Sequence, residues 1–225
     1  MRILRLDNWR QAAGEVLLIV VGILIALFVD SQWEQRKARQ EETEILSQIL
    51  ESLKLDRTYL LEQLAIAERR LQLLNELRGH VAVGSPHTPE LNDNFRAMRG
   101  WLVTEATAAP YDDLKSRGLD LISNQNLRQQ LIMHYDRIIP RVEARDRIDQ
   151  AQSLSEQHPY ARTRFRFDGA PLNYGEIIRD PEFLYLLEHK IASTENRTIP
   201  IYQEAIRSNE NLVSAIEREI GPPNH

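Results

Sequence analysis

Two neighbouring carboxylates, Asp112 and Asp113, are the residues of this sequence that come closest to a catalytic pair. Paired carboxylates can divide general acid and general base work only when both face the same reacting group. Neighbouring side chains on a helix point about 100° apart, so these two would face different directions. We therefore expect them to stabilise the N-terminus of a helix that begins near Pro110, beside Tyr111.

Residues that bind metals or cofactors show no recognisable spacing either. The 6 histidines contain no pair four positions apart, and there is no cysteine to supply a thiolate. Glycine-rich phosphate-binding motifs, the zinc-protease motif and the nucleophile-elbow motif are also missing from the sequence. We predict no catalytic residue, no metal site, no cofactor and no enzymatic activity.

A stretch over residues 158–175 interleaves aromatic and basic side chains, namely Tyr160, Arg162, Arg164, Phe165, Arg166, Phe167 and Tyr174. Aromatic rings beside cations can bind single-stranded nucleic acid, and the alternation over residues 163–167 is also typical of a strand edge. The chain carries a net charge of −5, however, which argues against a nucleic acid partner. We predict a loop that packs on the domain through its aromatic rings.

The strongest signal is an apolar run over residues 16–29, VLLIVVGILIALFV. This run makes about 21 Å of helix, so its flanks must help it to cross a hydrocarbon core of about 30 Å. Trp9 and Trp33 are about 36 Å apart along a helix, which suits two anchors at the membrane interfaces. We predict one transmembrane helix over residues 12–31, preceded by a short basic tail at residues 1–11.

Two other structures are compatible with the same run. Apolar runs of about 10–14 residues also form buried core helices. A basic start followed by an apolar run also fits a cleaved signal peptide, but FVDSQW at residues 28–33 lacks the paired small residues of a cleavage site. We favour an uncleaved signal anchor.

One face of the predicted span collects Glu15, Gly22, Ala26 and Trp33, which fall within about 20–40° of one another around a helix. Gly22 and Ala26 form a small-xxx-small pair, which lets two helices approach closely. This face is a candidate helix–helix interface. Glu15 either faces that interface or reaches the lipid head groups from about one turn inside the boundary, and we favour the second arrangement.

The chain has no glycine or proline between residues 30 and 78, so the span should continue as a long helix through residues 32–78. Residues 34–44 are nearly all polar and suit a solvated stalk. A heptad row of apolar residues follows at Leu46, Leu53, Leu60, Ala67 and Leu74. The row predicts either an oligomerising coiled coil or the first helix of a bundle within one chain, and we favour the bundle.

Residues 79–225 should complete an all-α bundle that packs on residues 45–78. Gly79 suits a helix C-cap, with a loop over residues 80–87. Other helix boundaries are predicted at Pro89, Pro110, Gly118, Asn124, Asp180 and Gly221. Pro140 and Pro200 should kink the helices that contain them. The inward faces should include Leu91, Phe95, Met98, Leu102, Leu127, Leu131, Tyr135, Phe183, Leu187 and Ile191.

Two blocks of the sequence carry a resemblance to a known group. Residues 14–27 read GEVLLIVVGILIAL with EQRK at residues 34–37, and residues 111–135 read YDDLKSRGLDLISNQNLRQQLIMHY. These blocks resemble a family of uncharacterised bacterial single-pass membrane proteins that open with a GEI-LVVIGILIAL helix and an NNWNE-RK stretch. Residues 30–33 read DSQW where that family has NNWN. The resemblance implies one membrane span and no catalytic residue.

These patterns predict a membrane-anchored interaction or scaffold protein of the bacterial inner membrane. Its expected partners are the lipid bilayer and either a second copy or another membrane protein. The alternative is an extracytoplasmic ligand-sensing domain that acts through a partner protein, because only residues 1–11 precede the span. Basic residues divide evenly across the span, with Arg2, Arg5 and Arg10 before it and Arg36, Lys37 and Arg39 after it. The N-terminal amino group adds to the first side, so we predict a cytoplasmic N-terminus and an external C-terminal domain.

Overall fold

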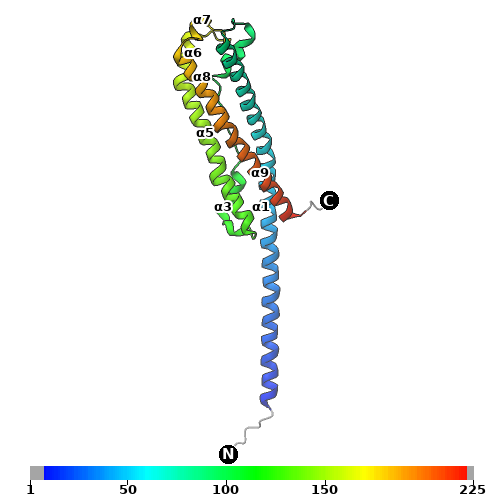
Figure 1. Cartoon of the computed structure of the whole chain (residues 1–225). Helices are drawn as coiled ribbons and strands as arrows, with labels where there is room; N and C mark the ends of the chain where they lie inside the picture. The colour runs from blue at the N-terminus through cyan, green and yellow to red at the C-terminus, as the bar shows by residue number, and fades with distance from the viewer. Residues whose placement is uncertain (1–7, 222–225) are drawn as a thin grey trace, which may run out of the picture. The chain divides into compact units, whose positions relative to one another are not determined.

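A computed structural model describes the backbone of residues 8–221 and the side chains of residues 15–221 (Figure 1). Every regular element in this range is a helix, and the only β-pairing within it is an isolated bridge between Phe165 and Pro171. The predicted all-α class is therefore confirmed. The chain divides into two compact units, Met1–Ile45 and Leu46–His225, which we describe separately.

The α-helices of the described residues are α1 (Asn8–Val83), α2 (Asn92–Ala97), α3 (Ala109–Arg117), α4 (Gln125–Met133), α5 (Ile139–Gln152), α6 (His158–Arg164), α7 (Tyr174–Ile177), α8 (Pro181–Ser193) and α9 (Ile199–Ile220). Short 3-10 turns form η1 (Pro89–Leu91) and η2 (Leu119–Leu121). Single π-helical turns form η3 (His134–Ile138), η4 (Ser153–Gln157) and η5 (Thr194–Thr198).

The first unit contains the N-terminal part of α1, and the apolar side chains of residues 16–29 are exposed. Its most apolar window has a mean hydropathy of 2.3, and 0% of that window is buried within the protein. By length and composition this is a helix that could cross a membrane, although a signal sequence has the same properties. A core helix would be mostly buried, so the buried-core alternative is wrong for this segment.

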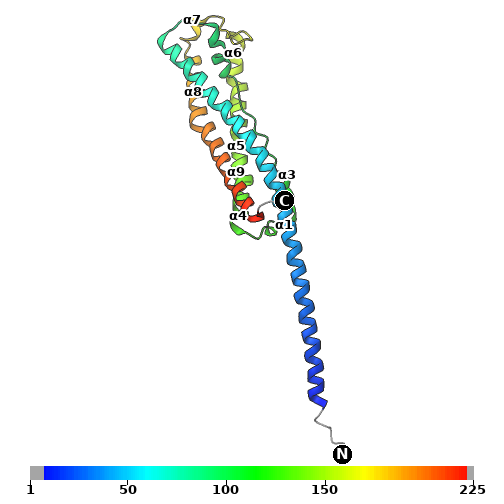
Figure 2. The same cartoon turned by 90° about the vertical axis from the view of Figure 1, so that its right-hand side faces the viewer.

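The second unit is a bundle built from three long helical segments. These are the C-terminal part of α1, the segment α4–η3–α5–η4–α6, and the segment α8–η5–α9, which lie side by side in both views (Figures 1 and 2). One core cluster gathers around Leu74, Phe95, Phe183 and Leu187. A second gathers around Leu60, Ala67, Val142 and Tyr202. The inward-facing residues predicted for α2, α4 and α8 are all buried.

The heptad row of α1 lies in this intramolecular core. Leu46, Leu53, Leu60, Ala67 and Leu74 are each at most 1% exposed. Side chains packed against the other helices of one chain are not available to a second chain. The bundle interpretation is therefore confirmed, and the row does not form the seam of an oligomeric coiled coil.

The first long helix ends later than predicted. It runs through Gly79 to Val83, and Gly84 takes the positive φ of 68° that suits a helix C-cap. Leu77 and Val81 pack on the core on either side of Gly79, and this packing offsets the cost of about 1 kcal/mol for a glycine inside a helix. The predicted boundary at residue 78 and the loop at residues 80–83 are therefore wrong.

Most other boundaries follow the predicted local signals. The Asn124 side chain accepts hydrogen bonds from the backbone N–H groups of Asn126 and Leu127, and that of Asp180 accepts one from Glu182. Gly118 and Gly221 follow α3 and α9. Pro89 begins η1 as predicted, and the side chain of Thr88 before it makes no capping hydrogen bond.

Each π-helical turn ends two residues before a proline, at Pro140, Pro159 and Pro200. A proline ring lacks an N–H and clashes with the carbonyl four residues earlier. Widening the preceding turn moves that carbonyl away from the ring; in η5, for example, the N–H of Ile199 donates to Thr194. The helices expected to kink at Pro140 and Pro200 therefore continue through each proline with a π-helical turn.

Candidate functional site

The predicted helix–helix face lies in the first unit and is uncovered there. Glu15, Gly22 and Ala26 are exposed, and a Cβ atom built on Gly22 would meet nothing within 4 Å. Trp33 is 71% exposed, while the side chain of Trp9 lies outside the described residues. Among the side chains of residues 15–45, none packs over this face.

The two neighbouring carboxylates do not form an acid pair. Asp112 lies in the first turn of α3, as predicted, whereas Asp113 forms an ion pair with Arg117 at 2.8 Å. The preceding Tyr111 donates a hydrogen bond to Asp136 at 2.9 Å. Asp113 therefore has a structural role as the partner of Arg117, while Asp112 contributes a negative charge to the first turn of α3.

The basic and aromatic stretch is more regular than predicted, because α6 extends to Arg164 before the chain turns. The ring of Phe165 packs on Phe95 at 5.1 Å, and Arg164 lies over the ring of Tyr160 at 4.3 Å. Packing of the aromatic rings is thus confirmed for these residues. It is wrong for Phe167, which is 100% exposed at the tip of the turn.

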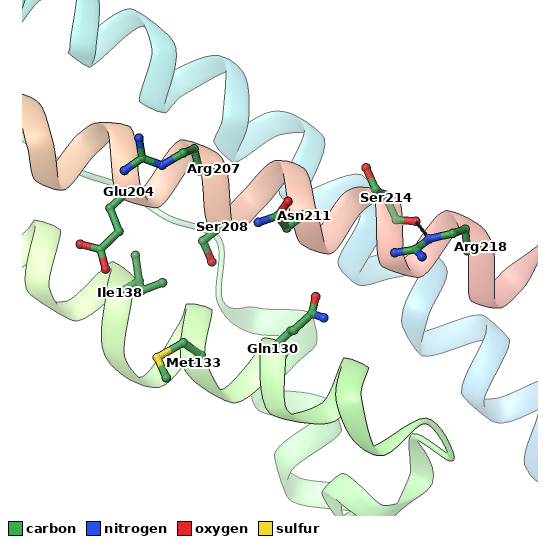
Figure 3. A pocket seen from close by; sticks show the side chains of 9 residues that line it. All are labelled: Gln130, Met133, Ile138, Glu204, Arg207, Ser208, Asn211, Ser214 and Arg218. Carbon is green, nitrogen blue, oxygen red and sulfur yellow. Dashed lines mark hydrogen bonds between the residues drawn. The ribbon is translucent and has the colours of Figure 1, made fainter.

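A polar groove lies between α4, η3 and α9 and has a volume of about 550 Å³ (Figure 3). We call it the α4–α9 groove; it is lined by Gln130, Met133, Ile138, Glu204, Arg207, Ser208, Asn211, Ser214 and Arg218. Volumes of about 300–1,000 Å³ are typical of small-molecule sites. Sequence reasoning missed this site, because its residues come from two helices about 70–90 positions apart whose proximity depends on the fold.

The charge of the α4–α9 groove is positive. Glu204 is neutralised by Arg141, whose guanidinium lies 3.0 Å away. Arg207 and Arg218 then leave two positive charges on the groove wall. The Arg218 Nε donates to the carbonyl oxygen of Ser214 at 3.0 Å, which holds this side chain along α9.

A buried histidine supports the groove from behind. His134 is 0% exposed, and its Nδ1 lies 3.0 Å from the Ser208 hydroxyl oxygen. Burial lowers the pKa of His134 to about 4, so the ring is neutral at pH 7. Its Nε2 is buried and has no hydrogen-bond partner among residues 15–221. The side chain is therefore a fixed and uncharged part of the bundle.

A second polar feature is buried within the bundle, and we call it the Asp149 cluster. The Asp149 carboxylate lies 2.6 Å from Lys190 Nζ, 3.3 Å from Arg70 and 3.8 Å from Arg145. All four residues are at most 6% exposed. Desolvation lowers the pKa of Lys190 to about 8, against the opposing attraction of Asp149.

The Asp149 cluster extends to a second carboxylate on α5. Asp146 accepts hydrogen bonds from the hydroxyl groups of Thr104 at 2.7 Å and Tyr202 at 2.8 Å. Burial raises the pKa of Asp146. Arg145 donates to the Ser193 hydroxyl at 2.9 Å. These bonds satisfy only part of each charged group, because Asp146 Oδ1 and Arg145 Nε are buried without a hydrogen-bond partner among residues 15–221.

The segment between α2 and α3 lies against these polar groups without forming a helix. Besides the Thr104 bond, the Val103 carbonyl accepts a hydrogen bond from Tyr59 at 2.6 Å. The Thr107 N–H donates to Asp56 at 3.0 Å, and burial raises the pKa of that carboxyl group. Side chains of the bundle thus satisfy two backbone groups of this non-helical segment, the Val103 carbonyl and the Thr107 N–H.

One signal for the Asp149 cluster was present in the sequence. Lys190 interrupts the apolar face of α8 between Leu187 and Ile191, where an apolar residue would be expected. A lysine at such a position is rarely buried without a partner. The sequence alone cannot identify that partner, because Asp149 lies 41 positions away and the polar α5 sequence offers several carboxylates.

No group of three or more potential metal ligands gathers within the part of the chain that the structure describes. No protein-family model, curated protein or solved structure matches the sequence or the structure. The resemblance of residues 14–37 and 111–135 to a family of bacterial membrane proteins therefore stays a prediction.

Proposed function

We propose that this protein is a membrane-anchored helical interaction or scaffold protein of the bacterial inner membrane, without catalytic activity. The observation that carries the proposal is the exposed apolar segment of α1, of which 0% is buried. A helix of this composition is stable in lipid, because all its backbone polar groups are satisfied internally. The second unit then acts as a folded module held at the membrane surface.

The proposal assigns self-association to the helix–helix face of the first unit. The heptad row of the second unit is already buried in its own core, so it supplies no oligomeric seam. Gly22 and Ala26 lie on an uncovered face and suit close packing of two helices in lipid. Glu15 lies near the end of the span, where its carboxylate reaches the head groups.

Disulfide crosslinking in membranes tests this assignment, since the chain contains no cysteine. Val29→Cys lies within about 20° of Gly22 around the helix, whereas Leu27→Cys lies about 140° away. Val29→Cys should crosslink to a second copy under mild oxidation and Leu27→Cys should not. Adding Gly22→Leu to Val29→Cys should reduce dimer formation about tenfold, equivalent to about 1.4 kcal/mol.

The matched control is Val20→Leu, which adds bulk about 160° away from Gly22 and should leave crosslinking unchanged. Equal crosslinking at both cysteine positions would show that the contacts are random collisions. A chain that stays monomeric at every expression level would contradict self-association.

A second candidate function is favoured by the α4–α9 groove. A ligand-sensing domain needs a concave site with polar groups that orient a small molecule. The groove supplies hydroxyl, amide and guanidinium groups on two helices of the second unit. In this alternative, ligand binding to the groove would be transmitted to a partner protein. Measuring the Val29→Cys crosslink with and without a bound ligand distinguishes a sensor from a passive scaffold.

A further inference from the structure

We propose that the α4–α9 groove binds a small organic monocarboxylate with an apolar body. The inference rests on the second candidate function, the ligand-sensing domain. It follows from the distribution of polar and apolar groups along the groove, seen in Figure 3.

One end of the groove presents hydrogen-bond donors that suit an anion. Gln130 of α4 and Asn211 of α9 project towards each other across the gap, and Arg218 lies beside them (Figure 3). The Arg218 Nε is bonded to the Ser214 carbonyl, which fixes the guanidinium and leaves its two terminal nitrogens for a ligand. A carboxylate only accepts hydrogen bonds and fits the planar donor pair of a guanidinium.

The middle of the groove offers another hydrogen-bond donor. A neutral His134 carries one ring proton, and its Nε2 is buried without a partner in the described structure. A buried N–H without an acceptor is costlier than an unpaired acceptor, so the proton belongs on Nδ1. Nδ1–H then donates to the Ser208 oxygen at 3.0 Å, and the Ser208 hydroxyl proton is free to point into the groove.

The other end of the groove places two apolar side chains, Met133 and Ile138, opposite Glu204 and Arg207 of α9 (Figure 3). Met133, which is 48% exposed, and Ile138 line the wall formed by α4 and η3. Unbranched methionine side chains adapt to varied apolar shapes. The apolar body of the ligand would lie against these two side chains while its carboxylate reaches Arg218. Phosphate and sulfate would leave Met133 and Ile138 uncovered, so a carboxylate with an apolar body is the better fit.

Isothermal titration of the full chain in lipid nanodiscs tests the proposal. The probes are hexanoate and benzoate, with hexanamide and benzamide as uncharged molecules of the same shape and inorganic phosphate as an anion without an apolar body. We expect at least one carboxylate to bind at least tenfold more tightly than its amide and than phosphate. Arg218→Gln should weaken carboxylate binding at least tenfold.

The matched control is Arg147→Gln, which removes an exposed arginine of α5 outside the groove and should leave binding unchanged. No carboxylate binding, equal binding of the amides or of phosphate, or equal effects of the two arginine substitutions would each overturn the proposal. Because binding is measured directly, its failure is distinct from failure of the crosslinking that tests the anchored interaction function. Binding without a change in crosslinking would leave the carboxylate site in place and remove only the sensing role.

Discussion

Asp149 shows how one residue can determine the free energy of burying several charged side chains. Three cations, on α1, α5 and α8, lie within 4 Å of its carboxylate, and all are buried. Such pairs are weak evidence for stability when intact, since desolvation opposes their attraction. Removing one partner lowers the stability strongly, because the remaining charges stay buried without a counter-charge.

We expect Asp149→Asn to lower the free energy of unfolding by about 3–5 kcal/mol, because it leaves Lys190, Arg70 and Arg145 without their shared counter-charge. Urea denaturation of the full chain in detergent, followed by circular dichroism, measures this change. Glu204→Gln is the control, because its ion pair with Arg141 is exposed and should be worth less than about 1 kcal/mol. Similar losses for both variants would contradict the buried cluster.

The buried His134 predicts that the free energy of unfolding falls as the pH is lowered. Its pKa is about 4 in the folded chain and 6.5 when unperturbed, so the unfolded chain binds more protons between these values. Stability contributed by the neutral ring is complete above pH 6.5 and is lost as the pH falls towards 4. The shift corresponds to at most about 3 kcal/mol.

We expect His134→Gln to flatten the pH dependence of unfolding between pH 6.5 and pH 4, compared with the unsubstituted chain. Denaturation midpoints measured at several pH values give the two slopes. The comparison is made between variants because Asp56 and Asp146, whose pKa values burial raises, titrate in both chains. Identical slopes would show that His134 is not the group that binds the extra proton.

At the scale of the element, adjacent leucines on α1 separate core from surface. Leu60 is 1% exposed and belongs to a core cluster, whereas Leu61 is 38% exposed. We expect Leu60→Ala to cost about 2–5 kcal/mol in the free energy of unfolding and Leu61→Ala to cost less than half as much. Urea denaturation of both variants measures the difference. Equal costs would mean that the heptad row does not pack within one chain as described.

Helix boundaries were predictable where the signal is local. Asn124 and Asp180 bond to backbone N–H groups two or three residues ahead, so their role needs no distant contact. The end of α1 was not predictable in this way, because both Gly79 and Gly84 suit a C-cap. Packing of Leu77 and Val81 on helices far along the chain decides between them.

The candidate site was less predictable than the fold. Every group in the α4–α9 groove has an ordinary sequence context, and its chemistry arises only when α4 and α9 come together. The Asp149 cluster likewise joins residues from three helices, although Lys190 on an apolar face gave a hint of it. Patterns with a helical period predict which residues are buried but not which polar residues meet.

At the scale of the whole molecule, the functional proposals depend on the orientation of the predicted membrane span. Three basic residues lie on each side of it, so the usual excess of Lys and Arg on the cytoplasmic side does not decide the question. The predicted signal anchor, a basic segment followed by an apolar helix, favours residues 1–11 in the cytoplasm. The carboxylate site would then face the extracytoplasmic space, where ligands arrive without crossing the inner membrane.

Single cysteines in this cysteine-free chain test that orientation. Ser155 is exposed on η4, and Ile3 precedes the span, so Ser155→Cys and Ile3→Cys report opposite sides of the membrane. In Gram-negative cells with a permeabilised outer membrane, an impermeant thiol reagent should label Ser155→Cys at once. It should label Ile3→Cys only after the inner membrane is lysed. The reverse pattern would place the second unit in the cytoplasm, and the groove would then sample cytoplasmic carboxylates instead of external ones.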